Sequence, residues 1–258
     1  MKRKFQSIIN NLPAIVAFVI ILIVWHLLCV TNTVPTYMLP SPSDVIKALI
    51  EDADLIAKHA IVSLKEAFYG LFIGIVLAFL MATLMDYCDL LYRAIYPVMV
   101  ITQTIPTIAI APLLVLWMGF GMEPKITLVV LTTFFPITVG LLDGYRSVDK
   151  DQINLLRAMG AKRNKIFSQV KLPVALPYFF AGLKISVSYA VVGAVISEWL
   201  GGFEGLGVYM TRVKKAYAFD RMFAVIIVIV VISLLLIRLV NIIRKLSMPW
   251  ERFTKINE

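Results

Sequence analysis

The sequence has few side chains that could carry chemistry. Its 258 residues include two cysteines and two histidines, and neither His26 nor His59 has Cys, Asp or Glu partners at a spacing typical of metal ligands. The chain also contains no GxxxxGK[ST] phosphate-binding loop and no GxSxG nucleophile elbow. We therefore predict no catalytic residue, no metal site and no cofactor in this chain, and the missing loop excludes ATP hydrolysis by that route.

Charged residues are also scarce, at 16% of the chain against 60% hydrophobic residues. An ordinary soluble domain is far less apolar, so this composition indicates an integral membrane protein. The formal net charge is +9. In a membrane protein, basic residues more often mark the cytoplasmic side than a nucleic-acid surface. We expect a lipid bilayer as a partner, and no nucleic acid.

Six segments are apolar over a length that can cross a bilayer, for which about 20 residues are needed. They are predicted at residues 12–30, 61–85, 94–118, 125–142, 178–200 and 221–240. The fold class is therefore an all-α membrane protein with six transmembrane helices, forming one domain over residues 1–258. Between the first two spans, Val45, Ile46, Leu49 and Ile50 predict a short amphipathic helix capped by Ser43 or Asp44, on the outer surface.

Small residues in the second span and prolines in the third predict how these two helices pack and bend. Gly70 and Gly74 in the second span are four residues apart, a spacing that permits close helix approach. The third span contains three prolines, each of which removes a backbone hydrogen bond, so we expect a kinked helix. Polar groups flank the middle proline, and such broken helices are common places for solute contacts. These candidate solute-path residues are Gln103, Thr104, Pro106 and Thr107.

The fifth span contributes two further candidate solute-path residues and one isolated cation. It is rich in small residues, among them Ser186, which allow tight packing or line a narrow path. Glu198 near its outer end and Lys184 nearer the cytoplasm should face protein or water, because a charge in hydrocarbon costs on the order of 2.5–3.5 kcal/mol. For Lys184 we favour snorkelling or an interhelical bond.

Lys65 and Glu66 in the second span are interpreted as interfacial anchors.

Residues 149–177 form a basic, polar island between the fourth and fifth spans. Ile153 and Leu156 mark one helical face, Gly160 allows a turn, and Ile166, Phe167 and Val170 begin a second apolar stripe. Pro173 and Pro177 predict that the second helix ends near Lys171. This pattern predicts a helix–turn–helix, here called the hairpin, whose apolar stripe is expected to bind a pocket on another protein.

The distribution of basic residues predicts the orientation of the chain. With the N-terminus inside, the larger share of the basic residues falls in cytoplasmic segments, which agrees with the positive-inside rule. These residues are Lys2, Arg3, Lys4, Arg93, Arg146, Lys150, Arg157, Lys162, Arg163, Lys165, Lys171, Arg238, Arg244, Lys245, Arg252 and Lys255. The hairpin and both termini are therefore expected in the cytoplasm, with the protein in the cell (inner) membrane.

Three segments resemble the permease subunits of binding-protein-dependent ABC importers. In the hairpin, Gly160-Ala161, Phe167, Leu172-Pro173 and Pro177 are similar to that family's cytoplasmic signature loop. Residues 103–121 (QTIPTIAIAPLLVLWMGFG) and 197–207 (SEWLGGFEGLG) resemble the branch that carries nitrate, aliphatic sulfonates, taurine and pyrimidine precursors of thiamine. The likeness extends from residue 39 to about 207. One departure is that Asn154, Leu155 and Leu156 stand where the family usually has Glu-Ala-Ala.

The resemblance implies a non-catalytic subunit of an ATP-driven importer. Its partners would be two copies of an ATPase subunit that binds ATP and magnesium, an external solute-binding protein, and a second permease, most simply another copy of this chain. The third and fifth helices would form the solute path. The ATPase would bind the hairpin at Leu155, Leu156, Arg157, Ala158, Met159, Gly160, Ala161 and Lys162.

The solute and the transport class leave alternatives open. A thiamine pyrimidine precursor or a related heterocycle is slightly favoured over sulfonate, taurine or nitrate. A secondary transporter that needs no ATPase would be expected to show internal repeats and several ion-coupling carboxylates within its spans, where this chain has little besides Glu198. A membrane-embedded enzyme has no candidate nucleophile or metal cluster.

Overall fold

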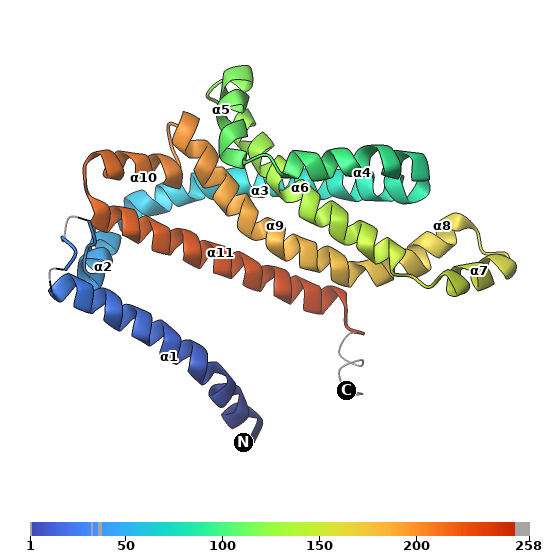
Figure 1. Cartoon of the computed structure of the whole chain (residues 1–258), viewed down its shortest axis with the longest axis horizontal. Helices are drawn as coiled ribbons and strands as arrows, with labels where there is room; N and C mark the ends of the chain where they lie inside the picture. The colour runs from blue at the N-terminus through green and yellow to red at the C-terminus, as the bar shows by residue number, and fades with distance from the viewer. Residues whose placement is uncertain (1, 32, 36–37, 251–258) are drawn as a thin grey trace. The chain divides into compact units, whose positions relative to one another are not determined.

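The fold is described here from a computed structural model that covers residues 2–31, 33–35 and 38–250. Every regular element in that part of the chain is helical (Figure 1). The elements are α1 Lys2–Val30, α2 Pro42–Glu51, α3 Ala53–Tyr87, α4 Asp89–Gln103, α5 Thr107–Met118, α6 Glu123–Arg146, α7 Lys150–Ala158, α8 Arg163–Ile166, the π-helix η1 Phe167–Lys171, α9 Leu172–Gly201, α10 Leu206–Lys215 and α11 Phe219–Ser247. Arg252 and Lys255, two of the basic residues expected in the cytoplasm, lie outside the described residues.

Four helices are long and apolar enough to span a membrane. They are α3, α6, the continuous segment Arg163–Gly201 and α11, and α4 with α5 makes a fifth if this bent pair is one span. The first predicted span corresponds to α1, in which Ile15–Val30 is a shorter apolar helix. The chain is therefore an all-helical, multi-pass membrane protein, with four to five candidate spans among the described residues.

The chain divides into two compact units, one of residues 1–58 and 209–228 and the other of residues 59–208 and 229–258. In the first unit the predicted amphipathic helix is present as α2, but its cap is Ser41 and not Ser43 or Asp44. The Ser41 hydroxyl accepts a hydrogen bond from the backbone N–H of Asp44. Pro42 occupies the first helical turn, where its missing N–H costs nothing.

Helices α6 and α9 run side by side in the second unit and form its centre (Figure 1). Their interface buries Ile137, Leu141 and Tyr145 of α6 against Phe180 and Val187 of α9. The predicted close approach at Gly70 and Gly74 is confirmed. A Cβ atom on either glycine would lie 2.4 Å from α6, meeting Val129 or Thr133.

Gly182 fixes how closely α6 and α9 approach. A Cβ atom there would lie 2.4 Å from the Pro136 carbonyl oxygen, which is backbone and cannot move aside. Gly193 is a matched control in the same helix, because its Cβ would first meet the Thr132 hydroxyl at 3.2 Å. We expect Gly182→Ala to lower the free energy of unfolding by roughly 1–3 kcal/mol and Gly193→Ala to change it little. Thermal unfolding of both variants in one detergent tests this, and equal melting temperatures would contradict it.

The kink expected in the third predicted span is confirmed and is sharper than a bend within one helix. Helices α4 and α5 meet at 100° across residues 104–106, and α5 stands nearly at right angles to α4 (Figure 1). Pro106 is the N-cap of α5, with an extended ψ of 125°. A proline cannot donate to the preceding turn, so the helix ends and starts again.

The helix end expected near Lys171 is wrong. Helix α8 continues through the π-helix η1 into α9, and Pro173 lies in the first turn of α9 while Pro177 lies inside it. The π-helix η1 gives a wider turn directly before Pro173, and the helix continues past both prolines. The segment between the fifth and sixth predicted spans also contains a helix, α10.

Candidate functional site

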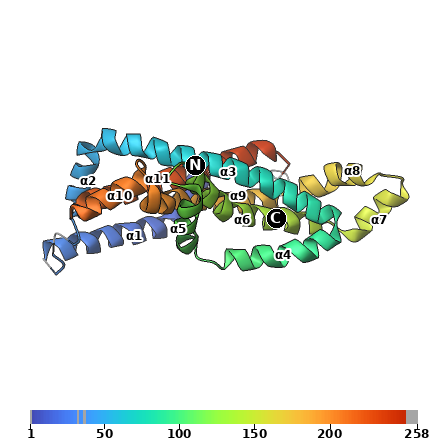
Figure 2. The same cartoon turned by 90° about the horizontal axis from the view of Figure 1, so that it is seen from above.

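The hairpin projects from one end of the second unit as α7 followed by α8 (Figure 2). Asp149 caps α7 by accepting a hydrogen bond from the Asp151 N–H at 2.9 Å. At the other end Gly160 has φ +83°, a left-handed conformation. The N–H groups of Gly160 and Ala161 donate to the carbonyls of Arg157 and Leu156, both at 2.9 Å. This pair of bonds is a Schellman motif, which closes the helix and fixes the turn.

The first helix of the hairpin has no buried side chain. Leu155 is 62% exposed and Met159 is 75% exposed, and they are four residues apart, so they lie on one face of the turn. Exposed apolar side chains of this size grouped together are typical of interaction surfaces. Leu156 and Ala161 are half-buried, and the other predicted coupling residues, Arg157, Ala158, Gly160 and Lys162, are exposed.

The second apolar stripe of the hairpin packs on its own chain, so the expectation that another protein covers it is wrong. Ile166 is buried. The Phe167 ring lies 5.2 Å from that of Tyr145 and 5.7 Å from that of Tyr87. The sequence showed the stripe but not that aromatic rings at the ends of α3 and α6 would cover it.

Polar contacts attach α8 and η1 to the end of α3. Arg163 donates to the last carbonyls of α3, Asp86 at 3.1 Å and Tyr87 at 2.8 Å, and its guanidinium lies 4.2 Å from the centre of the Tyr87 ring. Lys171 donates to both carboxylate oxygens of Asp86, at 2.7 and 2.9 Å. Tyr87 donates to the side-chain oxygen of Asn164 at 2.9 Å. The second half of the hairpin is therefore joined to α3 by these polar contacts and to α6 by Phe167, whereas α7 has no buried side chain.

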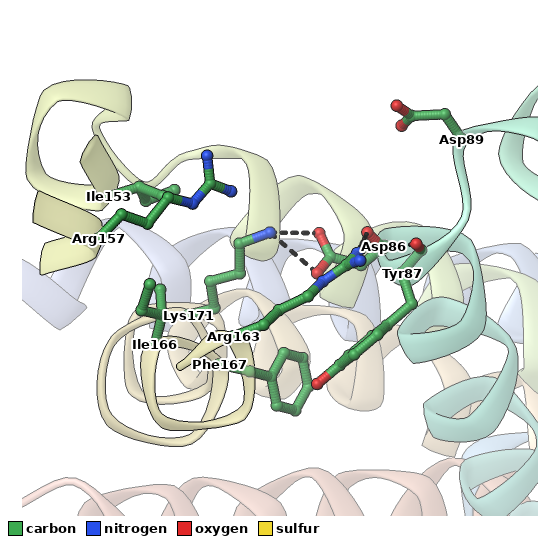
Figure 3. Close-up of a pocket in the computed structure, with 9 residues that line it drawn as sticks. All are labelled: Asp86, Tyr87, Asp89, Ile153, Arg157, Arg163, Ile166, Phe167 and Lys171. Atoms are coloured by element: carbon green, nitrogen blue, oxygen red, sulfur yellow. Dashed lines mark hydrogen bonds and ion pairs between the residues drawn. The ribbon is translucent and has the colours of Figure 1, made fainter. Parts of the chain in front are cut away.

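A cavity of about 200 Å³ lies between α7, α8 and the turn after α3 (Figure 3). It is lined by Asp86, Tyr87, Asp89, Ile153, Arg157, Arg163, Ile166, Phe167 and Lys171. Three of these side chains are basic and two are acidic. In Figure 3, Arg157 and Asp89 flank the Lys171–Asp86 ion pair from opposite sides. The excess of basic groups makes this cavity favourable for an acidic side chain.

The predicted solute-path residues fall into two different surroundings. Gln103, Thr104, Pro106 and Thr107 lie together at the break between α4 and α5, where the first three are exposed and Thr107 is half-buried. Ser186 is instead fully buried and donates to the Thr133 carbonyl of α6 at 2.8 Å. Glu198 is also buried and accepts from the Ser63 hydroxyl and the Gly207 N–H, both at 2.6 Å. Lys184 is exposed.

The interpretation of Glu66 as an interfacial anchor is wrong. Its carboxylate is 1% exposed and accepts a hydrogen bond from Lys125 at 2.7 Å. Lys125 is itself 5% exposed, although it follows Pro124 at the start of α6. The signal available in the sequence was that each residue lies near the same predicted end of an apolar span, where opposite charges can meet.

Comparison with known proteins identifies the family to which this chain is similar. Residues 70–250 match the family described as the binding-protein-dependent transport system inner membrane component. A probable ABC transporter permease of Haemophilus influenzae is 38% identical over 217 residues, 84% of this chain and 89% of that protein. The formylaminopyrimidine transport permease protein ThiX of Halalkalibacterium halodurans is 34% identical over 253 residues, 98% of this chain and 99% of that protein.

Solved structures show the same fold at lower identity. A chain of the MetNI methionine ABC transporter in an inward-facing conformation matches with a TM-score of 0.66 and 21% identity, over 76% of this chain and 97% of that one. This likeness shows that the described helices share the fold of that chain. The chain belongs to the binding-protein-dependent transport system inner membrane component family, and it is a non-catalytic permease subunit of an ABC importer.

Proposed function

We propose that this permease imports a small heterocyclic solute, with a thiamine pyrimidine precursor such as a formylaminopyrimidine as the substrate class. The observation that carries this proposal is the 34% identity to a formylaminopyrimidine permease over 98% of this chain. A taurine permease of Escherichia coli is 27% identical over 90% of the chain, and a putative aliphatic sulfonate permease of Bacillus subtilis is likewise 27% identical. Sulfonate or taurine import is therefore the second candidate. Family membership argues against an ATPase-independent secondary transporter.

The proposed assembly has two copies of this chain, each with six spans and cytoplasmic termini. An external binding protein delivers the solute, and two separate ATPase subunits bind ATP and magnesium. The break at residues 103–107 lines the solute path, because it combines exposed polar groups with an interrupted helix. Ser186 and Glu198 act from behind the path, where they hold α9 to its neighbours.

In this assembly α7 receives the ATPase and the rest of the hairpin transmits its movement. Residues 155–162 supply the contact, with Leu155 and Met159 as apolar anchors. An acidic side chain of the ATPase enters the cavity beside Arg157. When the ATPases close on ATP, force on α7 reaches α3, α6 and α9 through Phe167, Arg163 and Lys171, so the membrane helices change from inward-open to outward-open as packed bodies.

Uptake by reconstituted vesicles tests the substrate. We expect vesicles containing this chain, its ATPase and its binding protein to accumulate a formylaminopyrimidine only when ATP is present on the ATPase side. Taurine and an aliphatic sulfonate are the comparison solutes, under the same conditions. Accumulation of taurine instead would favour the second candidate, and ATP-independent uptake driven by an ion gradient would refute both.

Charge introduced at Leu155 and Met159 tests the docking surface. Burying each side chain in a partner contributes about 1.5–3 kcal/mol, so we expect Leu155→Glu/Met159→Glu to weaken ATPase association by more than roughly tenfold per residue. Asn154→Glu is the matched control, since it adds the same group to another face of α7. The measurement is the amount of ATPase that co-purifies with each of the two variants. Equal recovery of the ATPase with both variants would show that this face is not the contact.

A further inference from the structure

Four buried ionisable side chains meet where α3, α6 and α9 lie together in the second unit. Among the residues that the structure describes, His59, Glu66, Lys125 and Glu198 are the buried His, Lys and Glu side chains. We call them the buried charge cluster. The proposed coupling through the hairpin does not involve them, and their contacts are independent of the proposed substrate.

The hydrogen bonds of the cluster fix the protonation of its histidine. The Gly205 N–H donates to Nδ1 of His59 at 3.0 Å. Nδ1 can accept only when it carries no proton, so His59 is a neutral imidazole protonated at Nε2. Ser63 connects the same elements, because its hydroxyl accepts from the Leu206 N–H at 2.8 Å and bonds to Glu198.

The charges of the cluster do not balance if both carboxyls are ionised. One lysine and two carboxylates leave a buried net charge of −1, which is costly away from water. The second oxygen of Glu66, Oε2, is buried and has no hydrogen-bond donor. Glu66 lies one turn after Ser63 on the same face of α3, and Ser63 bonds to Glu198, so the two carboxyl groups approach each other from neighbouring helices. Two carboxyl groups can hydrogen-bond only if one of them carries a proton.

A bound proton would account for both the excess negative charge and the unpartnered oxygen of Glu66. A metal ion fits the site less well. The described residues hold no group of three or more His, Cys, Asp or Glu side chains arranged for a metal. Both Glu198 oxygens already accept hydrogen bonds from protein donors. A proton on one of the two carboxyl groups removes the excess negative charge, and it lets Glu66 Oε2 take part in a hydrogen bond.

We propose that Glu66 and Glu198 share one proton, which makes the buried charge cluster a proton-binding site that holds the segment before α10 in place. Gly205 lies directly on this site, since a Cβ atom there would be 2.2 Å from the Glu198 carboxyl carbon. Gly205 and Gly207 both bond to cluster side chains. With the proton bound the cluster is neutral overall, with one negative charge opposite Lys125.

Infrared spectroscopy of the full-length protein at neutral pH tests the site directly. We expect wild type to show a buried carboxylic-acid C=O band. The band should be lost in Glu66→Gln, because the amide replaces the protonated carboxyl and Glu198 remains ionised near Lys125. It should also be lost in Glu198→Gln, which keeps the test open if one variant folds poorly. Glu204→Gln, an exposed glutamate of the same segment, is the control that keeps the band.

The pH dependence of thermal stability gives a second readout. A carboxyl that is protonated in the fold ionises when the chain unfolds at neutral pH, so unfolding releases a proton and rising pH favours the unfolded state. The melting temperature of wild type should therefore fall as pH rises through neutrality, with a shallower fall in Glu66→Gln. Absence of the infrared band in wild type, or its survival in either single variant, would overturn the proposal.

Discussion

Gly160→Pro should abolish ATP-driven uptake and association with the ATPase while leaving the chain inserted in the membrane. Gly160 has φ +83°, and its N–H donates to the Arg157 carbonyl at 2.9 Å. Proline is fixed at a φ of about −65° and has no N–H, so the Schellman motif cannot form and α7 loses its position. Because Gly160 has open space around its Cβ position, the effect comes from the backbone alone. ATPase pull-down and vesicle uptake are the measurements.

Gly119 supplies a control with the same backbone requirement. It also has φ +83°, open space at the Cβ position and an N–H that donates, to Val115 at 2.8 Å. It lies after α5 and not in the hairpin. Gly119→Pro should therefore strain the chain comparably and leave ATPase association intact. Gly160→Ala, which costs about 1–2 kcal/mol in a left-handed conformation, should give an intermediate loss. If Gly160→Pro still binds the ATPase, the hairpin is not the docking site.

The periodicity and length of apolar runs predicted the helices well because a membrane span is a local property. Segments such as α3, α6 and α11 have enough apolar residues to be recognised without knowing their neighbours. The close approach at Gly70 and Gly74 was predictable for the same reason, since a small residue repeated on one face of a span has few other uses. The rule that a helix ends before a proline failed at α9, where the helix continues from the π-helix η1 past Pro173 and Pro177. No sequence feature predicted η1.

The polar contacts were not predictable because their partners are far apart in sequence. Glu66 and Lys125 are separated by 59 residues, Asp86 and Lys171 by 85, and Ser63 and Glu198 by 135. A charge near the end of a span can be explained without any distant partner, as an interfacial anchor. Only the packing of α3 against α6 and α9 shows which charges are removed from solvent and must find partners. That packing also buries Ser186 and Glu198, whereas the polar groups of Gln103 and Thr104 at the α4–α5 break stay exposed.

Removing the cation of the buried charge cluster should have the largest effect on folding. Lys125 and Glu66 have side chains only 7% and 1% exposed and are 2.7 Å apart. Breaking a buried pair by removing one partner costs about 3–5 kcal/mol, because the remaining charge is left unpaired. We expect Lys125→Met to prevent accumulation of folded protein or to lower its melting temperature sharply. Lys184→Met, at an exposed lysine of α9, should leave both quantities near wild type.

The double variant Lys125→Leu/Glu66→Leu separates loss of the charge pair from loss of packing. Replacing both partners of a buried pair by apolar side chains is often neutral or stabilising, so the double variant should recover much of the stability lost in Lys125→Met. Lower pH should also partly restore Lys125→Met, because protonating the remaining carboxylate removes the unpaired charge. Fluorescence-detected size exclusion and thermal unfolding in detergent measure both effects. A Lys125→Met protein as stable as wild type at neutral pH would show that the ion pair does not hold α3 and α6 together.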